Sequence, residues 1–485
     1  MRLQELVEKI PYRLAKNAPN GCLFHDIRHV TTDAAKATCD SIYVCTATAL
    51  REGHTLAAAA YGRGCRHFLA RRMPGLPDDA VVLVVEDPNA YAGELAARCL
   101  QHPARYMTVI GVTGTYGKTG TVQLLASILR QNGRAVSTLT TDGVDVMGVV
   151  SPAGRIVPDG VSLQEILHQF REAGTDIALL ELSSYMLKQK THLGVPFFAT
   201  LFTGVSPHHI GPREHVDWEE YCATKLSLLA QRAPFVIAPT QMQICDRLHG
   251  AQLLTAGDGG DACAKNLQPF AENGVFGTPF SLHICGNAMP IRLPLPGGDM
   301  VQNAVLAALG ATVLGLAPTA IAAGLAAAST PGRLALAWSD GERHIFQDSA
   351  YTAEDLTRAL RTLRTYTTGR LTVLVGSVGG RAKERRAPLG KAATDWADYT
   401  YFTADDPNFE NVTEICKQMA ADVADPARYC IVTDRARAIH QAVLQLRRGD
   451  TLLLAGKGAV PGQLVCGNDI PFSELSCIKD AVHDL

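Results

Sequence analysis

Short apolar runs alternate with longer amphipathic segments along most of the chain. The apolar runs are bounded by glycine, proline or polar residues, a pattern typical of buried strands. The segments between them repeat apolar residues at helical spacing. The expected strands are residues 41–45, 80–85, 106–110, 176–182, 197–203, 235–238, 371–376, 399–403, 429–432 and 451–455. The expected helices are residues 118–132, 218–229, 353–365 and 434–448, the last with Asp434 as its N-cap. Alternating strands and helices with short connections predict an α/β fold with a mostly parallel sheet.

The pattern changes character at two places, and this divides the chain into three blocks. One break lies near residues 102–103 and the other at the P-G-R sequence of residues 331–333, which gives blocks 1–103, 104–333 and 334–485. A length of 485 residues fits this number, at about 100–200 residues per domain. A polar, glycine-rich stretch at 256–274 predicts a loop or hairpin. The alanine-rich stretch at 303–329 contains three glycines and a proline, so it predicts two packed helices and not a membrane span.

Composition narrows the class of protein. Lys plus Arg number 45 and Asp plus Glu 47, so the near-neutral balance argues against a general nucleic-acid or membrane-binding surface. Charges interrupt every apolar run at the N-terminus, which is unlike a signal peptide. The 13 cysteines include no Cys-x-x-Cys pair, so we expect free thiols such as Cys22, Cys99 and Cys285 to serve as small core residues. We therefore expect a cytoplasmic protein that binds neither nucleic acid nor membrane.

A glycine-rich loop stands between an expected strand and an expected helix. Residues 111–119 read G-V-T-G-T-Y-G-K-T, with Gly114 and Gly117 ahead of Lys118 and Thr119. Glycines let backbone N–H groups turn toward phosphate oxygens, and the helix N-terminus adds partial positive charge. Lys118 would reach the terminal phosphates and the Thr119 hydroxyl would ligate Mg²⁺. The alternative is a glycine-rich turn with an exposed lysine, but the strand and helix on either side favour nucleotide binding.

Four further residues, Glu181, His209, His215 and Lys225, are considered for a metal site. Glu181 ends an expected strand, where ligands of open α/β sheets bind, and its carboxylate suits Mg²⁺. His209 and His215 follow the next expected strand, and either is a candidate ligand or an ordinary polar loop residue. Lys225 lies in an expected helix, and its spacing alone does not distinguish it from a solvated lysine.

Together these motifs resemble the Mur ligase family, the ATP-dependent amide-forming synthetases of peptidoglycan precursor assembly. Within it the chain looks most like the members that add the third residue of the stem peptide to UDP-N-acetylmuramoyl-L-alanyl-D-glutamate. The segments that carry the resemblance span almost the whole chain. They are T-T-D at 31–33, G-T-Y-G-K-T at 114–119, E-L-S-S at 181–184, F-T-G-V-S at 202–206 with His209, Lys225, Asn303, P-G-R at 331–333, Asp348, G-x-x-G-G-R at 376–381 and A-G-K-G at 455–458.

The resemblance implies a three-domain fold with a central P-loop ATPase-like parallel sheet and a Rossmann-like C-terminal domain. It also implies roles for individual residues. Catalysis would involve Lys118, Lys225 and His209; ATP would be held by Gly114, Thr115, Gly117, Lys118, Thr119, Gly120, Asn303, Arg333 and Asp348. Magnesium, as two ions, would be held by Thr119, Glu181 and His209, with Lys225 carbamylated. The other substrates would be held by Thr32, Asp33, Ser183, Arg381, Asp406, Asn408, Gly456 and Lys457.

The chain departs from the family pattern mainly where the amino acid binds. The diaminopimelate-adding members have D-N-P-R, but this chain has D-D-P-N at 405–408; Ala459 and Val460 replace the expected His-Glu. A diaminopimelate carboxylate favours a bidentate Arg and its ammonium favours a Glu, so that amino acid fits poorly. The family's residues before Pro158 and the Asp before His209 are also replaced.

Three functions remain open on these grounds. The first is an ATP-dependent ligase, expected to be a monomer, which would add the third amino acid of the stem peptide through an acyl phosphate. The second is a divergent Mur-type ligase that joins another carboxylate and amine. The third is a paralogue that binds a nucleotide but catalyses no reaction. The replacements at Gly204, His208 and Val460 favour this alternative.

Overall fold

The computed structural model describes residues 1–15, 19–47, 52–152, 158–206, 210–211, 214–272, 275–380 and 382–485. They group into two compact units. The first comprises Met1–Val122, Asn132–Asp261 and Leu309–Gly315, and the second comprises Gln123–Gln131, Ala262–Ala308 and Leu316–Leu485. Within the described ranges, no helix combines the length and apolar character needed to cross a membrane. The three-block division at residues 103 and 333 stays a prediction.

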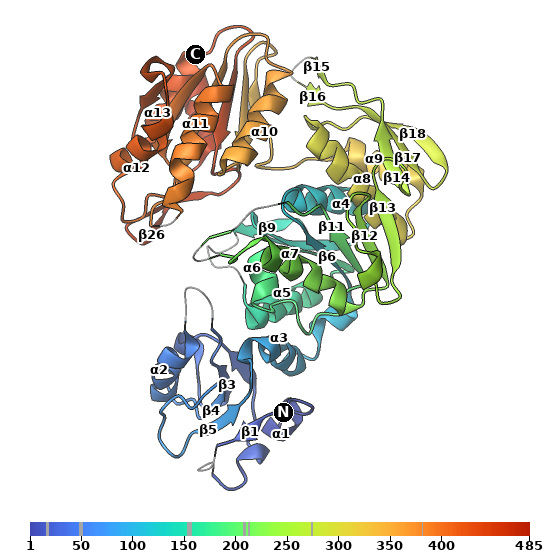
Figure 1. The fold of residues 1–485 in the computed structure, drawn as a ribbon, viewed down its shortest axis with the longest axis vertical. Helices are drawn as coiled ribbons and strands as arrows, with labels where there is room; N and C mark the ends of the chain where they lie inside the picture. The colour runs from blue at the N-terminus through green and yellow to red at the C-terminus, as the bar shows by residue number, and fades with distance from the viewer. Residues whose placement is uncertain are drawn as a thin grey trace. The chain divides into compact units, whose positions relative to one another are not determined.

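The first unit begins with a five-stranded sheet, in the order β1-β5-β4-β3-β2 (Figure 1). Strands β2 to β5 are parallel and β1 is antiparallel. Side chains alternate along β3, so that Ile42 and Val44 enter one buried cluster and Tyr43 enters another. Helices α1 and α3 cover the first face and α2 the second. The elements are β1 Arg13–Leu14, β2 His29–Thr31, β3 Ser41–Val44, β4 His67–Ala70, β5 Val81–Val84, α1 Leu3–Leu6, α2 Ala57–Gly62 and α3 Pro88–Cys99.

A second sheet in the first unit is built around strand β6. Its strands run β13-β12-β11-β6-β10-β7 in parallel, and β8 and β9 extend it as an antiparallel hairpin. Strands β6 and β10 are almost entirely buried, as expected for parallel strands covered on both faces. The elements are β6 Thr108–Thr113, α4 Lys118–Gln131, β7 Val136–Thr140, β8 Gly143–Val146, β9 Val149–Pro152, α5 Gly160–Glu172, β10 Ile177–Glu181, α6 Ser184–Lys188, β11 Ala199–Phe202, α7 Trp218–Leu226, β12 Phe235–Pro239 and β13 Gln252–Ala256.

The second unit contains a six-stranded sheet in the order β19-β20-β24-β21-β22-β23. All neighbours are parallel except β19, which pairs antiparallel with β20. Antiparallel strands β14, β17 and β18, hairpins β15–β16 and β25–β26, and helices α8 and α9 complete this unit. The elements are β14 Ala262–Lys265, β15 Phe270–Glu272, β16 Val275–Gly277, β17 Phe280–Ile284, β18 Asn287–Ile291, α8 Gly298–Val313, α9 Pro318–Ala326, β19 Ala335–Ser339, β20 His344–Asp348, β21 Leu371–Ser377, β22 Tyr399–Ala404, β23 Tyr429–Ile431, β24 Thr451–Ala455, β25 Gly462–Val465 and β26 Asn468–Pro471.

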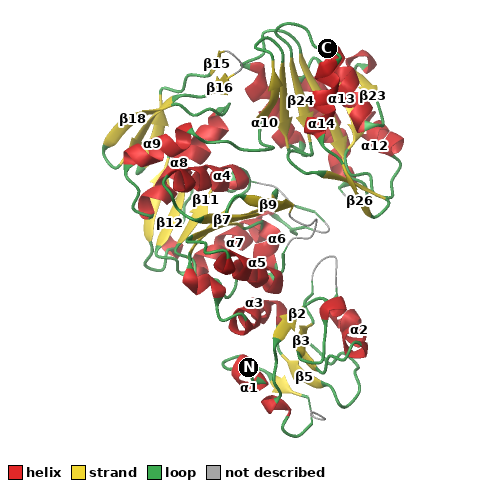
Figure 2. Cartoon of the chain, turned by 180° about the vertical axis from the view of Figure 1, so that it is seen from behind, coloured by secondary structure: helices red, strands yellow, loops and turns green. Residues whose placement is uncertain are grey.

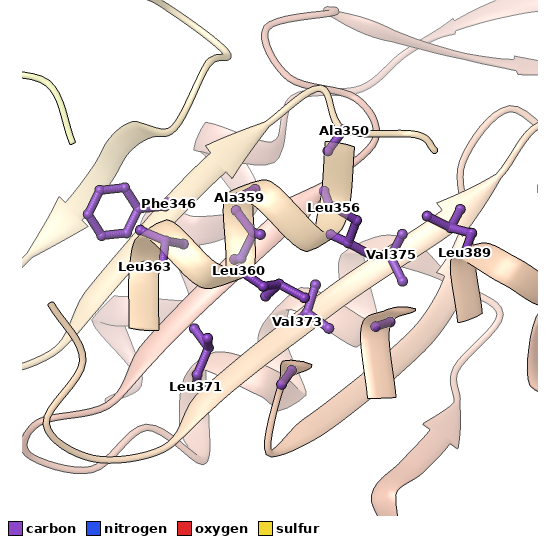
Figure 3. Close-up of a cluster of buried hydrophobic side chains, with 14 of the residues drawn as sticks. Phe346, Ala350, Leu356, Ala359, Leu360, Leu363, Leu371, Val373, Val375 and Leu389 are labelled. Carbon is purple, nitrogen blue, oxygen red and sulfur yellow. The ribbon is translucent and has the colours of Figure 1, made fainter. Parts of the chain in front are cut away.

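Helices cover both faces of the six-stranded sheet (Figure 2). Leu356, Leu360 and Leu363 lie on one face of α10, and they pack on Val373 and Val375 of β21 (Figure 3). Helices α11 and α12 extend the same layer, while α13 and α14 cover the opposite face. The helices are α10 Ala353–Arg364, α11 Arg386–Trp396, α12 Val412–Met419, α13 Arg435–Leu444 and α14 Glu474–His483. This three-layer arrangement confirms the predicted α/β class.

Most predicted elements are present, with a few corrections. Strand β6 runs to Thr113 and does not end at Gly111, because Gly111 pairs in register with strands on both sides. The stretch predicted as a loop or hairpin at 256–274 contains β14 and β15. The alanine-rich stretch forms two helices, as predicted. Cys22 is buried, but Cys285 is exposed in a turn and so is not the core residue that we expected.

Candidate active site

The glycine-rich loop connects the central strand β6 to helix α4. Gly114 has a φ of 146° and Gly117 a φ of 82°, conformations that favour glycine. A Cβ on Gly114 would lie 2.0 Å from the Thr203 hydroxyl, so a larger residue does not fit. Lys118 and Thr119 begin α4, where the helix N-terminus favours anions. This geometry fits the phosphate-binding role that the sequence predicts for the loop; Gly120 lies in the first turn of the same helix.

Residues that follow β11 hold this loop in place. The N–H of Thr115 donates to the Gly204 carbonyl at 2.8 Å, and the Thr203 hydroxyl bonds the Tyr116 carbonyl. The Thr115 hydroxyl lies 3.0 Å from the Tyr221 hydroxyl and accepts the Ser206 N–H at 2.9 Å. The loop conformation is thus set by contacts with a second strand end as well as by its own glycines.

Glu181 and Thr119 form an oxygen-rich corner beside the loop. The Thr119 hydroxyl donates to Glu181 Oε2 at 2.8 Å, and the Thr141 N–H donates to the same oxygen at 3.1 Å. Lys118 Nζ lies 4.0 Å from Glu181 Oε1. Glu181 is 4% exposed. A carboxylate and a hydroxyl are the donor types that Mg²⁺ prefers, so this pair fits that ion.

Lys225 of α7 points into the same region. Its Nζ donates to the Gly114 carbonyl at 2.7 Å and lies 3.4 Å from the Thr113 hydroxyl. The side chain is 1% exposed. Burial, followed by the positive charge of Lys118, lowers the pKa of Lys225 well below its ordinary value. The structure thus excludes a solvated surface position for this lysine and places its amine against the phosphate loop.

The predicted histidine ligands are described unequally. His209 lies outside the described residues, so its proposed metal role stays a prediction. His215 is buried; its Nδ1 lies 3.8 Å from Glu220 Oε2 and its ring packs edge-on against Tyr221. Across the described ranges, no cluster of three or more His, Cys, Asp or Glu side chains is arranged to hold a metal ion.

Three predicted substrate contacts also lie in the first unit. Thr32 is buried, and its hydroxyl bonds the Asp159 carboxylate. Asp33 Oδ1 accepts the Ala35 N–H at 2.9 Å and so caps the short 3₁₀ helix at Ala34–Lys36. Ser183 follows Glu181 by two residues and caps α6, with its hydroxyl accepting the Met186 N–H at 3.1 Å.

In the second unit, the predicted residues meet at the carboxyl ends of parallel strands. Asp348 ends β20, Gly456 follows β24, and Asp406 lies two residues beyond the end of β22. The Gly456 N–H donates to the Asp348 carbonyl at 2.9 Å. Ligands of open α/β sheets bind at this edge, so the placement supports a binding role.

Arg333 and Asp348 form one side of this edge. Asp348 accepts the N–H groups of Leu334 and Ala350 at 2.7 Å each. Burial raises the pKa of Asp348 to about 6, although the charge of Arg333 opposes that rise. Gly332 has a φ of 70°, and a Cβ there would lie 2.5 Å from the Ala459 nitrogen, so the P-G-R turn packs closely on the strand-end segment.

Lys457 and the D-D-P-N segment form the other side. Lys457 is 3% exposed, and its Nζ lies 2.8 Å from Asp406 Oδ1 and 3.3 Å from Asp405 Oδ1. Asn408 has a φ of 51°, and its Oδ1 accepts the Gly467 N–H at 2.9 Å. The ion pair with Lys457 balances the charge of Asp406. The hydrogen bond from Gly467 connects Asn408 to the β25–β26 hairpin.

Asn303 and Arg381 are the remaining predicted site residues. Asn303 lies on α8, is 8% exposed, and its Nδ2 lies 3.9 Å from Met300 Sδ. Arg381 lies outside the described residues. The sequence interpretation missed Thr141 and Asp405, although each directly follows a strand, β7 and β22 respectively, and that position was the available signal.

Comparisons with known proteins agree with the motifs. The Mur ligase middle domain matches residues 112–311, and the Mur ligase glutamate ligase domain matches residues 332–458. A UDP-N-acetylmuramoyl-L-alanyl-D-glutamate–2,6-diaminopimelate ligase of Chlorobaculum tepidum is 30% identical over 93% of this chain and 92% of its own length. A UDP-N-acetylmuramyl-tripeptide synthetase 2 of Oceanobacillus iheyensis is 27% identical over 96% of both chains.

Solved structures show the same fold. A UDP-N-acetylmuramoyl-L-alanyl-D-glutamate–2,6-diaminopimelate ligase superposes with a TM-score of 0.69 at 23% identity, over 100% of this chain and 99% of the other. A MurF ligase of Thermotoga maritima in complex with ADP gives a TM-score of 0.62 at 18% identity, over 94% of this chain and 97% of the other. The family models and the relatives lead to one conclusion: the chain belongs to the Mur ligase family.

Proposed function

We propose that this protein is an ATP-dependent ligase that adds the third amino acid to UDP-N-acetylmuramoyl-L-alanyl-D-glutamate in the cytoplasm. The observation that carries the proposal is the cluster of partly buried Lys118 with buried Thr119, Glu181 and Lys225 around the phosphate loop. This cluster supplies cations and oxygen donors next to a helix N-terminus, which suits a nucleoside triphosphate. The relatives that carry this activity in their names match along almost their whole length.

The reaction would proceed through an acyl phosphate. A glutamyl carboxylate oxygen would attack the γ-phosphorus of ATP, and the bond to the β-phosphate bridging oxygen would break to release ADP. The amine of the incoming amino acid would then attack the acyl carbon. Inorganic phosphate would leave and the amine would lose a proton, which gives the amide. Positioning and charge neutralisation are the protein's contributions to such a transfer.

The residues of the first unit would divide these tasks. Lys118 would contact the phosphate oxygens. Its positive charge would offset their negative charge while that charge is redistributed during phosphoryl transfer. Thr119 and Glu181 would hold Mg²⁺, which when bound supplies further neutralisation of the phosphates. Thr115 would keep the loop backbone turned toward the phosphates through its bonds to Tyr221 and Ser206.

Lys225 is the position where we propose a carbamate. Only a neutral amine can attack carbon dioxide, and burial beside Lys118 favours the neutral form of Lys225. The modification would replace a cation with an anion next to the Gly114 carbonyl, and His209 would join it as the second candidate ligand. Intact-protein mass spectrometry under bicarbonate, with Lys225→Ala as the control, tests this assignment.

Asp348, Arg333 and Asn303 would contact the nucleotide, and Lys457, Asp406, Asn408, Gly456 and Arg381 would surround the amino acid. Because Asn408 and Val460 replace the charged residues of diaminopimelate-adding members, the acceptor amino acid must be found by test.

Phosphate release is measured with ATP, Mg²⁺, the UDP-muramoyl dipeptide and each of a panel of amino acids. Release that depends on both the dipeptide and one amino acid is expected. No release with any amino acid would refute the proposal and favour another carboxylate and amine, or a non-catalytic paralogue.

A further inference from the structure

One carboxylate in the first unit serves two segments that are far apart in sequence. Asp159 caps α5, because its Oδ1 accepts the Ser162 N–H at 2.9 Å. Its Oδ2 accepts the hydroxyl of Thr32, a residue 127 positions earlier in the chain. Hydrogen bonds to a charged group are the stronger ones in proteins, so this pair links the two segments by one such bond.

The surrounding contacts are close and largely backbone to backbone. A Cβ on Gly160 would lie 2.7 Å from the Gly93 nitrogen, so α3 and the first turn of α5 touch through glycines. Val161 of α5 belongs to the buried cluster that contains Val44 of β3 and Leu95 of α3. The start of α5 is therefore packed into the core of the five-stranded sheet.

The same junction connects the proposed substrate segment at residues 31–33 to the helix that precedes the Glu181 strand. Thr32 lies beside Asp33, and the Asp33 N–H donates to the Thr31 hydroxyl oxygen at 3.0 Å, so residues 31–33 form one hydrogen-bonded turn. Helix α5 leads directly into β10, which ends at Glu181. A shift of Asp159 would thus change the position of the T-T-D segment relative to the strand that carries Glu181.

We propose that Asp159 is a positioning residue that fixes the T-T-D segment, through Thr32, to the start of α5. The expected effect of Asp159 on substrate binding rests on the proposed function, in which the T-T-D segment holds the UDP-linked substrate. The Thr32 hydroxyl then acts through Asp159, and Thr32 and Asp159 form one functional unit.

Kinetic variants test this assignment. Thr32→Val and Asp159→Ala should each raise KM for the UDP-muramoyl dipeptide by about tenfold, the order expected for one lost hydrogen bond to a charged group, with KM for ATP unchanged. Thr32→Ser keeps the hydroxyl and should restore the wild-type KM. The double variant Thr32→Val/Asp159→Ala should be no worse than Asp159→Ala, since the two residues share one interaction. Asp434→Ala, which removes the matching cap of α13, is the control for loss of a cap alone.

Hydrogen exchange of the substrate-free protein separates the junction from the proposed function. Thr32→Val should speed amide exchange in residues 29–36 and 160–164. Additive KM effects in the double variant, or unchanged exchange and KM in Thr32→Val, would overturn the assignment. If the wild-type protein does not use the dipeptide, the proposed function fails and exchange alone decides: faster exchange supports the junction, and unchanged exchange overturns it.

Discussion

Lys118 and Thr119 begin α4 and Glu181 ends β10, and in the proposed function nucleotide binding depends on the short distances between these three side chains. Lys118 approaches Glu181 within 4.0 Å, while Thr119 donates to it at 2.8 Å. Without nucleotide, the carboxylate thus partly balances the lysine. Bound phosphates would compete with Glu181 for Lys118, and a divalent cation beside Glu181 would remove that competition.

Lys118→Ala should lower kcat/KM for ATP by about a hundredfold or more, because a preorganised cation at the phosphates is lost. Steady-state phosphate release measures the change, and circular dichroism checks the fold. Lys391→Ala is the matched control, since Lys391 pairs with Asp395 on the surface of α11 at 2.7 Å and should leave kcat/KM unchanged. Equal rates for Lys118→Ala and the wild type would contradict the role of the loop.

Asp348 predicts a dependence of stability on pH. Burial raises its folded pKa to about 6 from an ordinary value of 3.8, so the folded protein binds the proton more tightly than the unfolded chain. The stability from this group is complete below about pH 4 and is lost as the pH rises through about 6. Relative to Asp348→Asn, the wild type should lose up to about 3 kcal/mol of unfolding free energy between pH 4 and pH 7. Urea unfolding at several pH values measures this slope, and parallel curves would refute it.

The residues of the phosphate loop could be predicted, because they are close to one another in the sequence. Gly114, Lys118 and Thr119 lie within six positions, and Glu181 was predicted from its place at a strand end. The Lys457 pair with Asp405 and Asp406, and the Thr32 bond to Asp159, connect residues of separate segments. Such pairs depend on strand order, which hydrophobic periodicity does not specify.

At the scale of elements, a buried ionic group joins α13 and α14 to the six-stranded sheet. Arg435 Nη2 lies 2.6 Å from Glu474 Oε1, and its guanidinium also donates to the Ala404 and Ala455 carbonyls at 2.9 Å each. Gln347 of β20 donates to the other Glu474 oxygen at 2.7 Å. Both charged side chains are at most 2% exposed, so the carboxylate depends on these partners.

Arg435→Met should therefore destabilise the protein by about 3–5 kcal/mol, because it leaves the Glu474 charge buried without its cation. Thermal unfolding measures the effect. Arg448→Ala is the comparison, since its ion pair with Glu342 is at the surface and should contribute at most about 1 kcal/mol. A similar small loss in both variants would show that the buried group does not stabilise the α13–α14 layer.

The elements that the sequence predicted best are the buried parallel strands. Residues 371–376 and 451–455 form continuous apolar runs, and they became the central strands β21 and β24. Strands β14, β17 and β18 were not predicted as a set, because they are short, lack a continuous apolar run and are separated by turn-forming residues such as Gly286. Their pairing is antiparallel and depends on tertiary contacts more than on local composition.

At the scale of the whole molecule, nucleotide binding should be visible as increased stability. A ligand that binds only the folded state adds about 2.7 kcal/mol at a concentration one hundred times its Kd. ATP with Mg²⁺ should thus raise Tm, and EDTA should remove most of the increase. The Lys118→Ala protein should show almost no increase. An equal rise in that variant would mean that ATP binds elsewhere.

The most direct test of the proposed ligase activity follows an oxygen atom from substrate to phosphate. The UDP-muramoyl dipeptide is labelled with ¹⁸O in its glutamyl carboxylate and is incubated with the protein, ATP, Mg²⁺ and the accepted amino acid. An acyl phosphate transfers one labelled oxygen to inorganic phosphate for each amide formed, and mass spectrometry of the phosphate detects it. We predict one ¹⁸O per phosphate in proportion to amide product. Amide formation with unlabelled phosphate, or phosphate release without any amide, would contradict the proposed reaction.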